Sequence, residues 1–127
     1  MIDKENEIFD AVAKKLREKF PKIYVVGTEI VSAPPRFPSV SLVQTNNAIE
    51  SKYSTFSSLE NVAKSDIKAE VFSNLDKGKD AQTKEITAVI SDVMCEFNYE
   101  RTFCEPIPNA DATIARRVSR YTNRNVI

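Results

Sequence analysis

The sequence predicts an α+β fold in which two helices cover one face of an antiparallel or mixed sheet of about five strands, in the order αβββαββ. Two segments, 3–20 and the residues between Gly78 and Phe97, repeat apolar residues at spacings of three and four, which is the helical period. The remaining regular segments have strand character, and several follow one another without a helix between them, which favours hairpins. A chain of 127 residues fits a single domain, 1–127.

The first helix is expected over residues 3–20. Asp3 can accept a hydrogen bond from the first turn as an N-cap, and Pro21 ends the helix because it lacks the N–H that a continued helix needs. Charged residues occupy the other faces, so the helix is amphipathic. The apolar stripe consists of Phe9, Val12, Ala13, Leu16 and Phe20.

Three segments follow before the centre of the chain. Residues 22–28 are rich in β-branched and aromatic side chains, which predicts a short strand covered on both faces. Residues 39–45 alternate in part between apolar and serine side chains and predict a second strand. Residues 46–64 are polar and without a clear period, so we expect a protruding loop or arm there.

Two of these regions suggest contact with a partner. Three prolines between the first two strands force an extended path that excludes a central strand. Aromatic side chains in polar surroundings are typical of surfaces that become buried against a partner, although ordinary exposed surface explains them as well. The candidate partner-contact residues are Pro34, Pro35, Arg36, Phe37 and Pro38 in the first region and Tyr53, Phe56 and Leu59 in the arm.

The centre of the chain is a strand followed closely by a helix. Ile67, Ala69 and Val71 alternate with charged residues, which is the two-residue period of a half-buried strand. The polar turn at Gly78 is short, so the helix must fold back on the sheet, and we expect the core at this contact. The apolar stripe of the helix consists of Ile86, Val89, Ile90, Val93, Met94 and Phe97.

Two further strands complete the predicted sheet. Residues 99–105 alternate along a fourth strand, which Pro106 and Pro108 are expected to close. Residues 111–121 predict the fifth strand, with alternating faces.

Composition excludes several kinds of chemistry. The 18 basic and 18 acidic residues cancel, so no overall field attracts the protein to DNA or to an anionic membrane. The absence of histidine removes the usual zinc ligand sets and imidazole-based catalysis, and two glycines cannot form a phosphate-binding loop. The polar first residues and the lack of a long apolar run predict a soluble protein with free thiols at Cys95 and Cys104. We expect neither an enzyme nor a bound cofactor or metal ion.

A stripe of small or polar residues follows the outer face of the second helix. Small side chains there would let another backbone approach closely, which suggests a subunit contact. The same stripe also fits an ordinary exposed helix, and the sequence leaves both interpretations open. The residues are Lys84, Ala88, Ser91 and Cys95.

Arginines are concentrated in the last strand. Alternation sends Arg116 and Arg120 to one face and Arg117 to the other, so they do not form one DNA-facing patch. We interpret them as inter-subunit residues that pair with carboxylates such as Glu100 or Glu105, because a guanidinium can bind a carboxylate at two points. Phosphate binding is the alternative.

Three stretches that cover most of the chain point to a known family. They are IYVVGTEIVSAPPRFPSVSLVQTNN, AEVFSNLDKGKDAQTKEITAVISDVM and FNYERTFCEPIPNADATIARRVSRY. In this order they resemble the tail terminator or tail completion proteins, often labelled minor capsid proteins, of long-tailed phages and prophages of Gram-positive bacteria. The proline segment, the SNL turn, the RTF triplet and the PNADATI segment carry the resemblance together. Residues 51–65 match least well.

The resemblance implies a small virion subunit that closes into a ring, typically of six, on top of the finished tail tube. There it would end tube polymerisation and offer a docking face to the head connector, while DNA only passes through the channel. Its partners would be its own copies, the tail tube protein and a head completion or connector protein, with no membrane. Its place would be the head–tail junction, after assembly in the host cytoplasm. We assign the outer face of the second helix and the last strand to the ring interface, which needs two different patches on one subunit.

Two alternatives stay open. A head completion or neck protein occupies a neighbouring layer of the virion and has a similar size. A small cytoplasmic ligand-binding or enzymatic domain would need a concave polar pocket, and the sequence nominates no residues for one.

Overall fold

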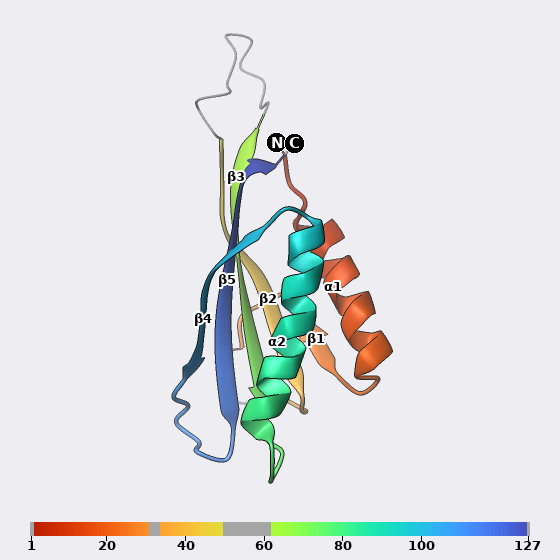
Figure 1. Ribbon diagram of the computed structural model, residues 1–127, viewed down its shortest axis with the longest axis vertical. Helices are drawn as coiled ribbons and strands as arrows, with labels where there is room; N and C mark the ends of the chain where they lie inside the picture. The colour runs from red at the N-terminus through yellow and green to blue at the C-terminus, as the bar shows by residue number, and fades with distance from the viewer. Residues whose placement is uncertain (1, 31–33, 50–61, 127) are drawn as a thin grey trace.

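The computed structural model describes residues 2–30, 34–49 and 62–126, and within them the predicted fold class is confirmed. Two helices lie on one face of a five-stranded mixed sheet whose strand order is β1-β2-β3-β5-β4 (Figure 1). We call this side the helix face and the opposite side the open face. The elements are α1 (Glu5–Lys19), β1 (Tyr24–Val26), β2 (Ser39–Ile49), β3 (Ala63–Ser73), α2 (Lys79–Glu96), β4 (Glu100–Ile107) and β5 (Ala115–Val126).

The order of the strands separates the two edges of the sheet. β1 pairs with β2 in parallel, and the other neighbours are antiparallel. β5 inserts between β3 and β4, so β4 forms one edge and the three-residue β1 forms the other. α2 lies mainly over β3 and β5, whereas α1 packs beside α2 and over β2 (Figure 1). Strand β4 therefore lies beyond α2, on the side of the molecule opposite α1.

The first helix forms much as predicted. Lys4 occupies the N-cap position, one residue later than expected, and Asp3 Oδ1 accepts a hydrogen bond from the Glu5 N–H at 3.0 Å. Val12, Ala13 and Leu16 of the predicted apolar stripe are buried, whereas Phe9 and Phe20 are half-buried. Ile8, which was not predicted, is also buried, so the helix is stabilised by its packing on the rest of the core.

The second helix is bounded by two residues in the left-handed region. Gly78 precedes it with φ 80°, and Asn98 follows it with φ 66°. The Asn98 N–H donates to the carbonyl of Cys95, and the Tyr99 N–H donates to that of Met94, both at 3.0 Å. This pair of hydrogen bonds satisfies two carbonyls at the helix end and turns the chain toward β4.

The core lies between the helices and the helix face of the sheet, as predicted. Burial alternates along β3 as far as Ala69 and is continuous from there to Ser73, and Ile67, Ala69 and Val71 belong to the core cluster. Among the residues of the core with the largest fully buried side chains are Ile8, Leu16, Ile67, Ile86, Ile90, Met94 and Tyr121.

The arm predicted over residues 46–64 is wrong at both ends. β2 continues to Ile49 and β3 begins at Ala63, and the two strands pair along this whole length. The register shifts just before Asn46, which is a β-bulge, and a bulge interrupts the alternation by which a strand is recognised. Residues 50–61 lie outside the described residues.

Both C-terminal strands end later than expected, β4 at Ile107 and β5 at Val126. β4 continues through Pro106 to Ile107, which an edge strand tolerates because one row of its N–H groups has no ladder partner. β5 begins later than the predicted 111–121, because Asp111 forms a turn in which its Oδ1 accepts the Thr113 N–H at 2.9 Å.

The start of the connection between β1 and β2 lies on the open face. The Ser41 hydroxyl, on the open face of β2, donates to the carbonyl of Thr28 at 2.7 Å. Glu29 reaches Lys68 on the open face of β3, with 2.6 Å between Oε1 and Nζ. These contacts hold Thr28 and Glu29 against the sheet.

Candidate functional site

A cluster of alternating charges occupies the open face. Glu70 of β3 is only 5% exposed, and its two carboxylate oxygens have different cationic partners. Oε1 lies 3.1 Å from Lys68 Nζ, and Oε2 accepts from Arg116 Nε and Nη2 at 2.9 and 2.7 Å. Lys68 also contacts Glu29, so four side chains from β3, β5 and the β1–β2 connection form one network.

The protonation states of this cluster support each other. The hydrogen bond from Lys68 holds the pKa of Glu29 below its ordinary value of 4.5. The same hydrogen bond raises the pKa of Lys68 above its ordinary value of 10.5, against the opposing effect of desolvation. Both partners are therefore charged over the whole range between these values.

An aromatic contact completes the cluster. The Arg116 guanidinium carbon lies 5.7 Å from the centre of the Phe72 ring, a side chain that is 3% exposed. This cation–π contact fixes the guanidinium over β3. Arg116, a candidate inter-subunit residue, thus finds its carboxylate in its own chain at Glu70 and not at Glu100 or Glu105.

Arg117 lies on the opposite face of the same strand. Its register partner on β3 is Val71, a core residue, and the side chain is 8% exposed. Nη1 lies 3.9 Å from the Cys104 sulfur, which is a weak acceptor, and the buried Nε makes no hydrogen bond to any residue that the structure describes. The predicted division of Arg116 and Arg120 from Arg117 is therefore confirmed by the register, whereas the deep burial of Arg117 was not predicted.

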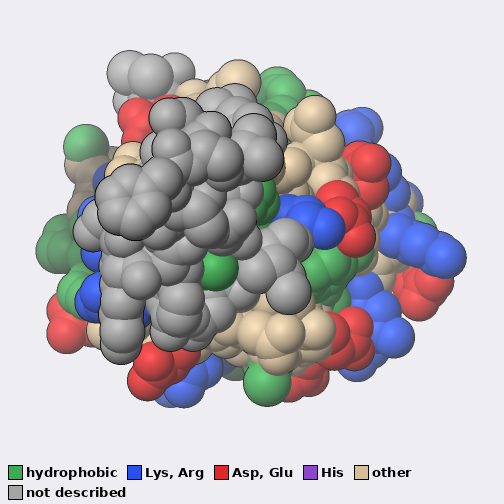
Figure 2. Space-filling model, turned by 90° about the horizontal axis from the view of Figure 1, so that it is seen from above, with side chains coloured by type: hydrophobic (Ala, Val, Ile, Leu, Met, Phe, Trp, Pro, Cys, Tyr) green, Lys and Arg blue, Asp and Glu red, His purple; other side chains and the backbone are tan. Residues whose placement is uncertain are grey.

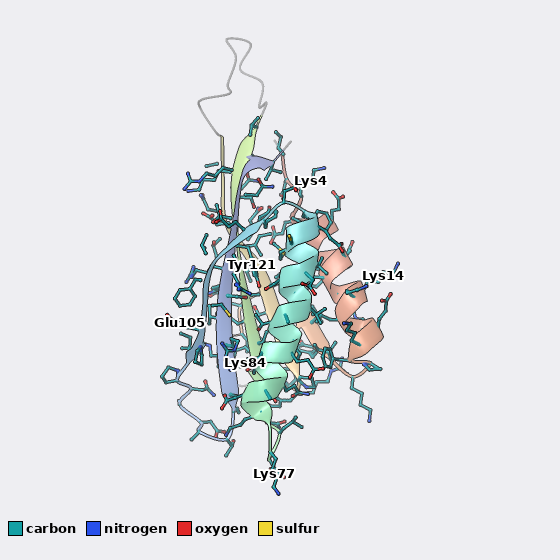
Figure 3. All side chains as sticks on the ribbon, viewed as in Figure 1. Lys4, Lys14, Lys77, Lys84, Glu105 and Tyr121 are labelled. Atoms are coloured by element: carbon teal, nitrogen blue, oxygen red, sulfur yellow. The ribbon has the colours of Figure 1, made fainter. Side chains whose placement is uncertain are left out.

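The stripe predicted on the outer face of α2 lies on the flank that faces β5 and β4. The Ser91 and Tyr121 hydroxyl oxygens are 2.8 Å apart, and Arg101 Nη1 donates to Ser91 at 3.4 Å. Ser91 is therefore half-buried and not on a free outer surface, while Lys84, Ala88 and Cys95 are exposed. Figure 3 shows Lys84 on the side of α2 toward β5, and Tyr121 between α2 and β5.

We call this region the α2–β4 strip. It joins two groups that the sequence suggested separately, the small-residue stripe of α2 and one arginine of the last strand. Its charged members are all basic. The residues of the strip are Lys84, Ala88 and Ser91 of α2, Arg101 and Cys104 of β4, and Arg117 of β5.

Strand β4 is open on both faces. Each of its residues is exposed or half-buried, including the apolar Phe103 and Ile107, which lie on the open face beside Arg120 and Arg116. Arg120 is itself exposed. This edge therefore presents apolar and charged side chains together, a composition that protein interfaces share.

The proline segment is only partly available to a partner. Pro34 is buried, Phe37 and Pro38 are half-buried, and Pro35 and Arg36 are exposed. The Arg36 guanidinium lies 5.2 Å from the centre of the Tyr24 ring, and the Phe37–Pro38 peptide bond is cis. The other candidate contact residues, Tyr53, Phe56 and Leu59, lie outside the described residues.

Sequence reasoning missed the role of Glu70. Its only signal was its alternation with Ile67, Ala69 and Val71, which assigned it to the polar side of a strand. Its partner Arg116 is 46 positions away, so no local pattern could reveal the pair.

Two searches of the described residues gave negative results. No group of three or more acidic or cysteine side chains comes close enough there to hold a metal ion. Neither α1 nor α2 combines the length and the apolar character that a membrane-spanning helix needs.

Burial raises the pKa of two tyrosines of the core. They are Tyr121, next to the strip, and Tyr99, after α2. Both phenols are therefore neutral near neutral pH, and the Tyr121 hydroxyl lies within hydrogen-bond distance of the Ser91 hydroxyl.

Comparison with known proteins does not extend this picture. No protein-family model matches the chain, and no curated protein matches it.

Proposed function

We propose that this protein is a structural subunit of a phage virion that forms a ring on top of the tail tube. In this function it ends tube polymerisation and provides the docking face for the head connector. Its partners are copies of itself, the tail tube protein and a head completion or connector protein. It acts by fitting neighbouring subunits and not by converting a substrate.

The observation that carries this proposal is the open edge strand. Neither face of β4 is fully covered by the described residues, and its open face bears Phe103 and Ile107, with the exposed Arg120 opposite Phe103. Burial of these side chains by a partner is favourable, because apolar area leaves water and the Arg120 guanidinium meets an acceptor. The resemblance described above supplies the identity of the assembly.

The lateral arrangement of the fold also suits a ring. A cyclic ring uses two different patches on opposite sides of each subunit. β4 and α1 lie on opposite sides of the molecule (Figure 1), and Figure 3 shows the same separation between Glu105 on β4 and Lys14 on α1. One subunit can therefore present its β4 side to the α1 side of the next.

Charge does not favour a single large binding face. The formal net charge is zero. Figure 2 views the molecule from its upper end, and on the part of this end that it shows in colour basic and acidic side chains are interleaved. Contacts with partners are therefore expected to depend on local pairing and shape, since no strong overall field is present.

Deletion of the gene tests the proposed function. Host cells that assemble particles without this protein should contain tails of uncontrolled length, or heads and tails that are not joined, in electron micrographs. Expression of the wild-type gene from a plasmid is the control and should restore normal virions. Normal virions in the deletion strain would refute the proposal.

Imaging of the assembled neck separates the terminator from its neighbours. A ring of this protein stacked directly on the tail tube supports the terminator function. A ring that contacts the portal instead would assign the protein to the head completion or neck layer.

A further inference from the structure

We infer that Arg117 receives a carboxylate from a second copy of this chain, which docks the side of the molecule formed by α1 against the α2–β4 strip. The inference rests on the proposed ring and names the contact that closes it.

The first step concerns the free-energy cost of burying the Arg117 guanidinium. A guanidinium carries five N–H donors and a permanent charge, and its burial is unfavourable unless acceptors replace the water it loses. Arg117 is 8% exposed, yet its only hydrogen bond to a described residue goes to the sulfur of Cys104 at 3.9 Å. The isolated subunit therefore leaves a buried charge poorly compensated.

The second step is the lack of a carboxylate within the described chain. None of the ion pairs formed between described residues includes Arg117. Asp80, in the first turn of α2, is exposed and makes no ion pair with it. An acceptor from another molecule would complete the site.

The third step is the charge around Arg117. The flanking side chains Lys84 and Arg101 are exposed and basic, and Arg101 is directed toward Ser91 on the same flank of α2. Asp80, at the start of the same flank of α2, is exposed and acidic. A partner that covers the part of the strip around Lys84 and Arg101 therefore gains from acidic groups. Because the net charge of the chain is zero, another copy carries an equal number of acidic groups.

The fourth step is the mode of contact. β4 has features that oppose the addition of another strand: Pro106 lacks an N–H, the register shifts between Arg101 and Phe103, and the strand carries the charged residues Glu100, Arg101 and Glu105. The partner is therefore expected to bind through side chains above the helix-face side of β4 and not by extending the sheet.

The fifth step identifies the docking side. α1 lies on the side of the molecule opposite β4, where the heterologous contact of a ring requires the second patch (Figure 1). Its N-terminal half exposes Glu7 and Asp10, whereas its C-terminal half exposes mainly basic side chains, so only the N-terminal half suits the strip in charge. The Glu7 side chain is 60% exposed and only loosely paired, with 3.6 Å between its Oε2 and Lys4 Nζ. These carboxylates have the sign that the strip requires.

A charge-exchange experiment tests the contact without altering the core. One variant combines Lys84→Glu with Arg101→Glu, and the other combines Glu7→Lys with Asp10→Lys; all four positions are exposed. Native mass spectrometry and sedimentation should show a closed oligomer for the wild type and mainly monomer for each variant alone. An equimolar mixture should restore the oligomer with both variants in equal numbers, since every interface then joins opposite charges. Circular dichroism checks that each variant is folded.

Arg117→Met tests the anchoring residue, with Asp80→Asn as the matched control on the same flank. Methionine should raise the dissociation constant of the oligomer at least about tenfold, since a desolvated charge pair is lost. Asp80→Asn should not raise the dissociation constant, because it removes no basic group from the strip. Unaltered assembly of Arg117→Met would overturn the inference.

The remaining outcomes separate the inference from the proposed function. If the wild type forms a closed oligomer and the strip variant does so equally well, the inference is wrong and the ring stands. If both variants are monomeric and their mixture stays monomeric, the pairing of the strip with α1 is wrong. A wild type that is monomeric at every concentration also overturns the inference, and the deletion and imaging experiments then decide the proposed function.

Discussion

Two neighbouring arginines of β5 have opposite environments. Arg116, on the open face, donates twice to the buried Glu70 carboxylate and lies over the Phe72 ring. Arg117, on the helix face, is more deeply buried, but among the described residues its side chain donates only to the sulfur of Cys104. The open-face cluster around Glu70 thus satisfies its charges within the subunit, whereas Arg117 in the α2–β4 strip has no carboxylate among the described residues. The comparison teaches that burial alone does not make a charged residue structural, because its counter-charge decides which molecule it stabilises.

The largest effect on stability is expected when the carboxylate that pairs with two cations inside the subunit is removed. Glu70→Ala removes the buried carboxylate that Arg116 and Lys68 share on the open face. We expect the free energy of unfolding to fall by about 3 kcal/mol, since breaking a buried pair leaves an uncompensated charge. Urea denaturation followed by circular dichroism measures this change. A loss of stability no larger than that of an ordinary surface substitution would show that the cluster does not stabilise the fold.

A smaller loss of stability is expected when Arg116, the partner of Glu70, is replaced. Arg116→Met removes two hydrogen bonds, but Glu70 keeps Lys68 at 3.1 Å. The free energy of unfolding should fall by roughly 2 kcal/mol. Self-association of the folded protein should be unchanged, because the Arg116 guanidinium is satisfied in its own chain. Weakened association without loss of stability would reverse the roles assigned to the two faces.

The hydrogen bond between the Tyr121 and Ser91 hydroxyls should contribute less to stability than Arg116 does. Tyr121→Phe keeps the buried ring and removes the hydroxyl that lies 2.8 Å from Ser91. The expected loss of stability is about 1 kcal/mol. A double-mutant cycle with Ser91→Ala isolates the pair, and independent effects of the two substitutions would show that the hydroxyl groups do not interact.

The smallest effect concerns the exposed end of the open-face cluster and depends on pH. The folded pKa of Glu29 is lowered, so its contribution is complete above the unfolded value of 4.5 and is lost as pH falls through the folded pKa. The folded pKa of Lys68 is raised, so its contribution is complete below 10.5 and is lost as pH rises through the folded pKa.

Glu29→Gln should therefore lower stability slightly and by a constant amount between pH 5 and pH 9, and the difference from the wild type should shrink below pH 4.5. Thermal unfolding at a series of pH values measures this difference. A difference that grows on acidification would contradict the assigned direction of the pKa shift.

Much of the fold was predictable because its signals are local. The stripe from Ile86 to Met94 shows the helical period, and the alternation from Ile67 to Val71 shows that of a strand. Both patterns arise because one face of each element packs against the other, so the strand, the helix and their contact in the core follow together.

The ends of β2 and β3 were not predictable in this way. Asn47 and Ala48 are polar or small, and the bulge before Asn46 breaks the alternation. They belong to a strand because they pair with residues 64 and 65 across the hairpin. Pairing depends on the partner strand, which the local composition does not reveal.

The candidate site was predictable in part for a related reason. Alternation placed Arg116 and Arg117 on opposite faces, because this depends only on strand geometry. Their different environments depend on Glu70, far away in the sequence, and on the path of α2 over β5. Residue type and spacing near the two arginines reveal neither the distant partner Glu70 nor the path of α2.

The most direct test of the difference between the two arginines is the effect of Arg117→Met on stability and on self-association, measured on one preparation. Urea denaturation at a concentration where the wild type and the variant are monomeric should show a free energy of unfolding that is higher by about 1 kcal/mol, since a poorly compensated buried charge is removed. Sedimentation of the same samples at high concentration should show weaker assembly. A variant that is less stable as a monomer and assembles like the wild type would contradict us, because Arg117 would then serve the fold of the single subunit.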